Sequence, residues 1–279
     1  MPDSGPYAVW IGRDVVEASG EEAAQYLQGQ LSQDVLAAGD GASTWTWILT
    51  PQGKVEVLAR VTRLSRERWL LDTDEGWGEA MVGRLNRFKL RTKVTIEQLD
   101  WRVLGLREGA AAEVEGAVGA DPAWPGVRGI DLIGAELTAP EGIRVMGPAE
   151  YEAERIAVGF PKMGADIDER TIPGETGLVG RTVSFTKGCY TGQELVARID
   201  SRGGNVARRL VRFAADGKVE AGSVLVTPGG ENAGVVTSVA ETSAGAWVGL
   251  GYIKRGVATE EPLAAGAEGV AITVLGPVG

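Results

Sequence analysis

The chain has 279 residues, of which 38 are acidic and 28 basic, so its formal net charge is −10. Nucleic acids and anionic membranes attract positive surfaces, so we expect neither direct nucleic-acid binding nor membrane binding. Histidine is absent and cysteine occurs once, which excludes Ser-His-Asp and Cys-His catalysis, histidine-rich zinc sites and an intramolecular disulfide.

The single thiol also limits metal binding. Iron–sulfur clusters usually take four thiolates, so one chain cannot enclose a cluster with its own cysteines, and the sequence predicts no metal site. The start M-P-D-S-G-P-Y lacks the basic and apolar regions of a signal peptide, and no run reaches the ~18 apolar residues of a membrane span. We therefore expect a cytoplasmic protein in a reducing compartment.

The first hundred residues mix helix and strand signals. Ser19-Gly20-Glu21-Glu22 has the spacing of a capping box and predicts a helix that extends to about Ser32. Strands are predicted over 43–49, 55–61 and 69–72, then a helix over 77–88 and strands over 94–99 and 101–106. This order is typical of an α+β fold with a mostly antiparallel sheet.

Two features of this part carry alternative interpretations. The segment 84–93 holds five cations and no acid; a solvated helix face is the favoured interpretation, and a dock for an anionic ligand or an acidic partner is the alternative. Trp10 is expected in the core or sheet packing, with the wall of a pocket for a flat aromatic ligand as its alternative.

In the rest of the chain, the composition and the predicted structure change twice. Residues 108–136 are rich in Gly and Ala and predict short elements and loops, and Pro148 starts a helix. A loop-rich, acidic stretch follows over 159–180. Beyond Gly204, strands are predicted over 208–213, 223–226, 233–239, 246–252 and 270–275, which suggests a small β-barrel. Five arginines between 198 and 212 form a second basic cluster, which we expect to pair with the acidic loop.

Between these regions lies the segment Thr186–Arg202, which holds the only cysteine, Cys189. Thr191 and Glu194 have the spacing of a capping box, so Cys189 is expected just before a helix. The helix entrance and the nearby Lys187 favour a thiolate, and Gly188 leaves the sulfur uncrowded. The alternative, which spacing alone favours, is a small buried hydrophobic residue.

The octapeptide K-G-C-Y-T-G-Q-E at Lys187–Glu194 resembles the signature of the YgfZ family. These are folate-binding proteins related to the T-protein, the aminomethyltransferase of the glycine cleavage system. The segments 26–34, 85–96, 155–161 and 173–178 also resemble family stretches. The signature residues beside Cys189 and Lys187 are Gly188, Tyr190, Gly192, Gln193 and Glu194.

The resemblance implies a fold of two related α+β units, 1–100 and 101–202, and a C-terminal β-barrel, 203–279, around a central cavity. It implies tetrahydrofolate or a one-carbon derivative as ligand, with Glu175, Arg155 and Tyr190 as contacts. It also implies support of iron–sulfur cluster assembly or maintenance in client enzymes, tRNA-modifying enzymes among them. Cys189 and Lys187 would be the catalytic residues, and iron–sulfur client or assembly proteins the partners.

Two departures from the family pattern bear on activity. T-proteins carry a pair of aspartates, one of them catalytic, where this chain has Val57 and Leu58, so a conventional aminomethyltransferase is not expected. Ala157 stands where the family has a carboxylate suited to the amino-pyrimidine edge of the pterin, and a methyl group accepts no hydrogen bond. Folate binding would then be weaker or depend on Glu175. The alternatives are a folate-dependent one-carbon (aminomethyl) transferase and a non-enzymatic scaffold that has lost folate.

Overall fold

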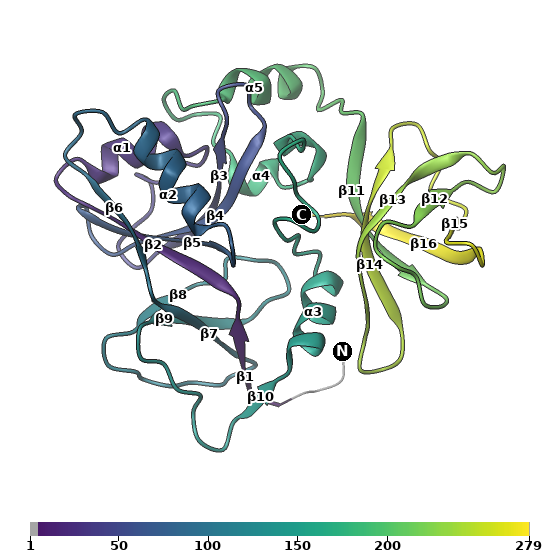
Figure 1. The fold of residues 1–279 in the computed structure, drawn as a ribbon, viewed down its shortest axis with the longest axis horizontal. Helices are drawn as coiled ribbons and strands as arrows, with labels where there is room; N and C mark the ends of the chain where they lie inside the picture. The colour runs from purple at the N-terminus through teal and green to yellow at the C-terminus, as the bar shows by residue number, and fades with distance from the viewer. Residues whose placement is uncertain (1–4, 279) are drawn as a thin grey trace. The chain divides into compact units, whose positions relative to one another are not determined.

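The computed structural model describes residues 5–278 (Figure 1). The chain folds into two compact units. The first contains residues up to 147 together with 181–194, and the second contains 148–180 together with the chain from 195 onward.

The first unit holds two five-stranded sheets. One has the order β3-β4-β5-β2-β6 and is antiparallel throughout; its strands are β2 (Arg13–Ser19), β3 (Ser43–Leu49), β4 (Val55–Arg63), β5 (Arg68–Asp74) and β6 (Thr95–Leu99). The other has the order β10-β1-β7-β9-β8; its strands are β1 (Tyr7–Ile11), β7 (Arg102–Arg107), β8 (Val118–Ala120), β9 (Gly129–Gly134) and β10 (Arg144–Met146). In this second sheet β1 pairs parallel to β10 and the remaining pairs are antiparallel. The expected α+β class with mostly antiparallel pairing is confirmed.

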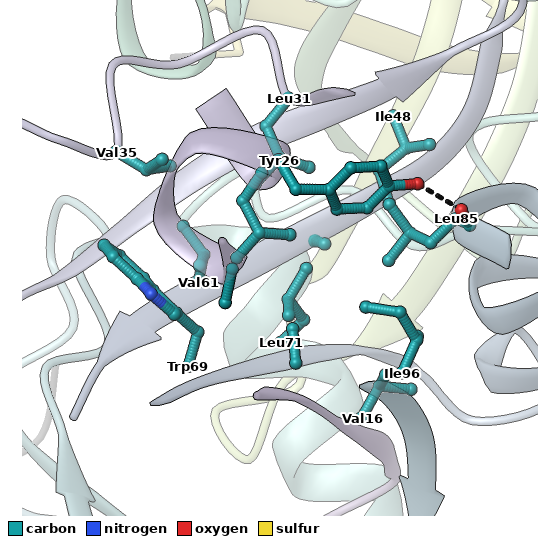
Figure 2. Close-up of a cluster of buried hydrophobic side chains, with 14 of the residues drawn as sticks. Val16, Tyr26, Leu31, Val35, Ile48, Val61, Trp69, Leu71, Leu85 and Ile96 are labelled. Atoms are coloured by element: carbon teal, nitrogen blue, oxygen red, sulfur yellow. Dashed lines mark hydrogen bonds between the residues drawn. The ribbon is translucent and has the colours of Figure 1, made fainter. Parts of the chain in front are cut away.

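Two helices, α1 (Ala23–Gln30) and α2 (Gly78–Arg87), share a buried apolar cluster with the first sheet. Figure 2 shows this cluster, in which the Tyr26 hydroxyl donates a hydrogen bond to the Leu85 carbonyl and so ties α1 to α2. Neighbouring residues of a strand face opposite sides, so Val16 and Leu71 pack under the helices while Val15 and Leu70 join a cluster with the second sheet. The first sheet is therefore buried on both faces.

The predicted capping box at Ser19 is wrong. Ser19 is the last residue of β2, where it pairs with Arg68 and Thr95, and α1 begins at Ala23. The Glu22 side chain accepts a hydrogen bond from the Lys93 backbone at 2.6 Å and makes no cap bond to the helix. Strand pairing has overridden a local signal of about 1 kcal/mol.

The second unit is built on a closed six-stranded barrel of order β11-β14-β13-β12-β15-β16, which confirms the predicted small barrel. Its strands are β11 (Arg208–Ala215), β12 (Val224–Val226), β13 (Asn232–Glu241), β14 (Trp247–Lys254), β15 (Leu263–Ala265) and β16 (Val270–Pro277). The helix α3 (Pro148–Ala157) and the short 3-10 turn η1 (Pro173–Glu175) belong to the same unit. The chain passes between the units within α4 (Val179–Thr182) and α5 (Gln193–Ser201).

The strands of one sheet do not come from one continuous stretch of the sequence. The strands β1 and β2 were not predicted, and β1 pairs with β7 and β10, which come from the second predicted unit. The division at residues 100 and 202 and the central cavity stay predictions. In the described part of the chain, no helix combines the length and the apolar character needed to cross a membrane.

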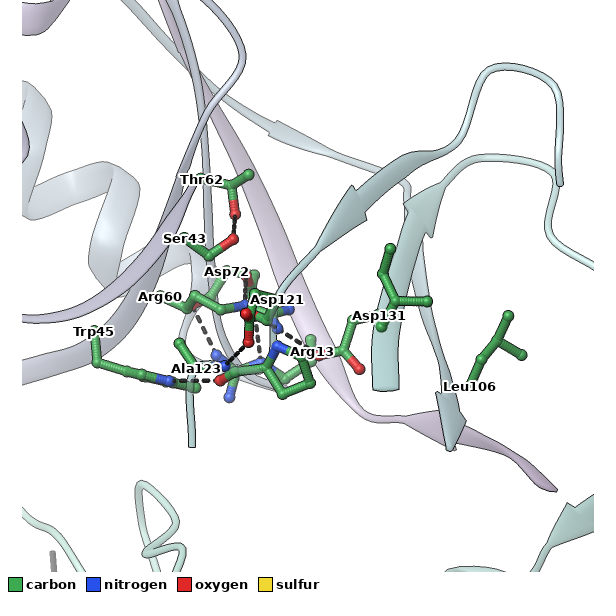
Figure 3. Close-up of polar contacts among 12 residues, drawn as sticks. Arg13, Ser43, Trp45, Arg60, Thr62, Asp72, Leu106, Asp121, Ala123 and Asp131 are labelled. Carbon is green, nitrogen blue, oxygen red and sulfur yellow. Dashed lines mark hydrogen bonds and ion pairs between the residues drawn. The ribbon is translucent and has the colours of Figure 1, made fainter. Parts of the chain in front are cut away.

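A buried ion network connects the two sheets of the first unit (Figure 3). Arg60 of β4 pairs with Asp72 of β5 at 2.9 Å and with Asp131 of β9. Arg13 of β2 holds Asp72 at 2.8 Å, and Arg107 of β7 holds the other oxygen of Asp131. Every one of these side chains is buried. The sheet-to-sheet contact therefore depends on matched charges as well as apolar packing.

The charges in the network hold one another in the ionised form. Burial raises the pKa of Asp131, but Arg60 and Arg107 outweigh that effect and keep this pKa below its usual range. A carboxylate with a lowered pKa stabilises the fold at neutral pH and loses that contribution as the pH falls through its folded pKa.

We predict that Asp131→Ala lowers the free energy of unfolding by about 3–5 kcal/mol, because the buried Arg107 loses its carboxylate partner and the buried Arg60 keeps only Asp72. The control is Glu17→Gln, which breaks the partly exposed Arg68–Glu17 pair and should cost less than about 1 kcal/mol. Urea unfolding followed by tryptophan fluorescence measures both. Equal losses in the two variants would contradict a special role for the network.

Candidate functional site

The signature segment folds onto the first unit, against the end of α1. The Ser184 backbone donates to the Ser32 carbonyl at 3.0 Å, and the Thr191 backbone donates to the Gly29 carbonyl at 3.2 Å. The Gln33 side chain adds a bond to the Arg181 carbonyl at 2.8 Å. The segment is thus fixed on both sides of Cys189.

Lys187 makes the densest contacts of this site. Its Nζ donates to three backbone carbonyls, those of Gln28 at 2.6 Å, Leu31 at 2.6 Å and Gln33 at 3.0 Å. These carbonyls lie at and after the end of α1, where a helix leaves acceptors without partners. Burial lowers the pKa of Lys187 to about 8, opposed by the nearby Asp34. All three ammonium protons hold the loop, and the expected effect of Lys187 on the Cys189 sulfur stays a prediction.

Tyr190 is the buried anchor on the other side of the cysteine. Its ring lies 5.2 Å from the Lys187 ammonium, and its side chain is almost fully enclosed. Burial raises the pKa of its hydroxyl to about 12, so the phenol stays neutral at physiological pH. Its backbone N–H donates to the Gln193 side chain at 3.2 Å.

The expected capping box at Thr191 is replaced by another arrangement. The helix α5 begins at Gln193, whose side chain reaches back to Tyr190, and the Thr191 hydroxyl lies 3.5 Å from the Gln30 side-chain oxygen. Gly192 has a φ of +84°, and a Cβ there would lie 2.5 Å from the Thr50 carbonyl oxygen. Only glycine allows the segment to approach the turn between β3 and β4 so closely.

Cys189 itself is free and exposed. The alternative of a small buried hydrophobic residue is therefore wrong. The neighbouring Gly188 has open space around the position of a Cβ, so the loop leaves the sulfur accessible. The site combines an accessible thiol with a backbone that is held by Lys187, Tyr190 and Gly192.

Arg155, expected to contact folate, has no donor left for a ligand. Its five N–H groups reach both oxygens of Glu152, the Phe160 carbonyl at 2.7 Å, Asp166 at 3.0 Å and Ser238 at 3.0 Å. A guanidinium offers five donors, so all of them are used. Arg155 fastens α3 and its following loop to β13, which is a structural task.

Glu175, another expected folate contact, uses only one of its two carboxylate oxygens within the fold. One oxygen accepts from Arg208 at 3.2 Å, and the Arg208 guanidinium lies 4.0 Å over the Tyr252 ring. This confirms for Arg208 that the second basic cluster pairs with the acidic loop. The Glu175 side chain is 11% exposed, and among the described residues its second oxygen accepts no hydrogen bond. Glu175 therefore has one carboxylate oxygen that can accept a further hydrogen bond.

Three further residues bear on the folate hypothesis. Val57 and Leu58 are completely buried in β4, and neither carries a carboxylate. Ala157 ends α3, and its backbone carbonyl accepts from Arg212 at 3.4 Å. None of the three offers a side-chain acceptor to a ligand.

Trp10 lines a cavity of about 560 Å³ where β1 meets β2 and β6 meets β7, and a role of this cavity in binding a flat ligand stays a prediction. The Arg102 guanidinium lies 3.8 Å over the Trp10 ring. One face of the ring is therefore covered by an arginine.

Sequence reasoning missed the acceptors of Lys187 and the role of Arg84, which is buried and donates to the Leu49 carbonyl at 2.9 Å. Backbone carbonyls carry no sequence signal. Only the fold, which brings α1 beside the signature, identifies them.

Known proteins resemble this chain in sequence and in fold. Residues 208–278 match the family described as the CAF17 C-terminal beta-barrel domain. An uncharacterized protein of Haemophilus influenzae is 29% identical over 68% of this chain and 67% of its own length. The mitochondrial iron-sulfur cluster assembly factor IBA57 homolog of Mycosarcoma maydis is 30% identical over 71% of this chain.

The chain spans little more than half of that assembly factor, 54% of its length. Among solved structures, the glycine cleavage system aminomethyltransferase T from Bartonella henselae aligns with a TM-score of 0.81, covering 97% of this chain and 85% of its own, at 19% identity. The chain therefore has the aminomethyltransferase T fold and ends in a barrel of the CAF17 type.

We predict that Gly192→Ala destabilises the protein by about 1–3 kcal/mol, because the residue has a positive φ and its Cβ would collide with Thr50. Gly188→Ala is the matched control in the same loop, since its Cβ meets open space. Thermal unfolding and limited proteolysis of the segment measure the difference. An equal effect of the two substitutions would contradict the close approach at Gly192.

Proposed function

We propose that this protein supports the assembly or maintenance of iron–sulfur clusters in client enzymes, with Cys189 as the thiol that contacts the cluster or its carrier. The observation that carries the proposal is a single exposed thiol on a loop held by the half-buried Lys187 and the buried Tyr190. A fixed backbone presents the sulfur in one position without closing it off.

The cluster is cargo, because this chain does not supply the ligands to keep it. In the described residues, no group of three or more Cys, His, Asp or Glu side chains is placed to hold a metal ion. One thiolate from Cys189 would complete or exchange a ligand of a cluster whose other ligands belong to a partner. The similarity to mitochondrial iron-sulfur cluster assembly factors supports this assignment. Cytoplasmic enzymes, tRNA-modifying enzymes among them, are the proposed clients.

We further infer that tetrahydrofolate or a one-carbon derivative binds through Glu175. The carboxylate has one oxygen fixed by Arg208 and one open, which suits a hydrogen bond from an amino-pyrimidine. When bound, a reduced folate supplies a carrier for a one-carbon group. Arg155 is not part of this proposal, since its donors are used within the fold. Tyr190 stays a proposed contact through its hydroxyl.

Aminomethyl transfer is the weaker candidate. Proton transfer at a folate nitrogen needs a titratable side chain, and Val57 and Leu58 provide none. A scaffold that binds no folate is the remaining alternative, and it predicts that Cys189 can be replaced without effect.

We predict that Cys189→Ser fails to restore iron–sulfur enzyme activity in a strain that lacks the gene, although the variant accumulates normally, because a hydroxyl is a poor cluster ligand. Gly188→Ala in the same loop should restore activity like the native chain. The measurement is the specific activity of an endogenous [4Fe–4S] dehydratase in extracts. Full restoration by Cys189→Ser would favour the scaffold.

For the ligand, we predict saturable binding of tetrahydrofolate that weakens about tenfold to a hundredfold in Glu175→Gln, since a hydrogen bond to a charged group is worth roughly 1.5–3 kcal/mol. Calorimetric titration measures this, with the exposed Glu220→Gln on the barrel as the control. Absence of binding to the native chain would remove folate from the proposal and leave the role of Cys189 standing.

A further inference from the structure

An unusual surface lies at the end of α2. The residues 87–91, R-F-K-L-R, form a turn that we call the basic tip. Leu90 at its centre is 91% exposed and has a φ of +43°, and Phe88 is 36% exposed. A non-glycine residue with a positive φ is uncommon, and an apolar side chain this exposed gains from burial against a partner. The tip therefore presents an apolar side chain that a binding partner would bury.

The cations of this region divide into two kinds. Arg84 is buried and pairs with Glu56 at 3.1 Å, and Lys93 pairs with Glu21, so these two are used within the fold. Arg87, Lys89 and Arg91 form no ion pair among the described residues. In a chain of net charge −10, three unpaired cations around an exposed leucine form a local positive patch.

The end of α1 supports both the basic tip and the Cys189 loop. The Arg84 guanidinium lies 4.2 Å over the Phe88 ring and donates to the Gln30 side chain at 3.1 Å. The same Gln30 oxygen lies 3.5 Å from the Thr191 hydroxyl of the signature. Contacts of α1 with Leu85 on one side and with Lys187 on the other fix the two features to one platform, all within the first unit.

We propose that the basic tip and the exposed Cys189 loop form one docking surface for an acidic protein that gives or receives the cluster. This inference rests on the proposed function. Charge complementarity selects the partner: Arg87, Lys89 and Arg91 attract a negative surface, whereas the rest of this acidic chain repels it. The partner would dock on the basic tip, and its cluster would then contact the Cys189 thiol.

A protein is a better occupant of this surface than an RNA. Leu90 gains from an apolar contact, which a phosphate backbone does not offer. The net charge of −10 also opposes a long polyanion, while a protein with a local acidic patch is attracted only where the cations lie.

The first test measures the field at Cys189, the only thiol of the chain. The probes are two disulfide reagents, the dianion dithiobis(nitrobenzoate) and the neutral dithiodipyridine. The tip variant is Arg87→Glu with Lys89→Glu and Arg91→Glu. The control variant reverses three exposed cations of the barrel, Lys218→Glu with Lys254→Glu and Arg255→Glu.

We expect the ratio of anionic to neutral reaction rates to fall about threefold to tenfold in the tip variant at low ionic strength and to stay unchanged in the control. The difference should shrink at ~0.15 M salt, where the Debye length is about 8 Å. An equal fall in both variants would mean that only net charge matters, which overturns the shared surface.

The second test restores iron–sulfur enzyme activity in the strain that lacks the gene. We expect the tip variant and Leu90→Ser to fail at native abundance and thermal stability, and the barrel variant to succeed. Restoration by the tip variant, with Cys189→Ser still inactive, overturns this inference and keeps the proposed function. Restoration by Cys189→Ser instead removes the proposed function. Binding of bulk tRNA that the tip variant loses would assign the surface to RNA and overturn the protein partner.

Discussion

The ammonium group of Lys187 is the contact on which the candidate site depends. It closes the end of α1 by donating to three carbonyls that the helix leaves open, and it thereby fixes the loop that carries Cys189. Burial works against this charge and lowers the pKa of Lys187 to about 8, so the interaction is maintained against a desolvation cost. A neutral side chain could fill the same space but could not satisfy three acceptors at once.

The sheets of the first unit, on which the loop packs, are held together by a second set of electrostatic contacts. The first sheet is buried on both faces, between the helices and the second sheet, and Arg60 crosses to Asp131 in that interface. The network balances three arginines with three aspartates, since Asp74 also pairs with Arg13, at 3.1 Å. Such a network stabilises little relative to an apolar core, yet it penalises any sheet alignment that separates its members. Precise alignment of β3 and β4 in turn positions the turn that Gly192 approaches.

Sequence patterns predicted the elements that depend on neighbouring residues. They failed where pairing with a distant strand decides the local structure. The strand over Ser43–Leu49 and the closed barrel follow from alternation and turns. The strand β2 was missed because Ser19 looks like a helix cap until β5 and β6 pair with it. At the site, the motif located Cys189, but its exposure and the partners of Lys187 require the fold. Arg155 shows the same limit, since resemblance cannot reveal that five donors are already used.

The basic side chains discussed above fall into two groups, those that the fold uses and those of the basic tip. Where a cation is needed by the fold, as with Arg84, Arg60 or Lys187, the chain buries it and pairs it with carboxylates or carbonyls. The cations of the basic tip have no such role, because they form no ion pair among the described residues. Leu90 beside them is 91% exposed, so its apolar surface gains nothing from folding and would gain from burial against a partner. The contacts of α1 with Leu85 and with Lys187 keep this surface and the thiol in the same unit.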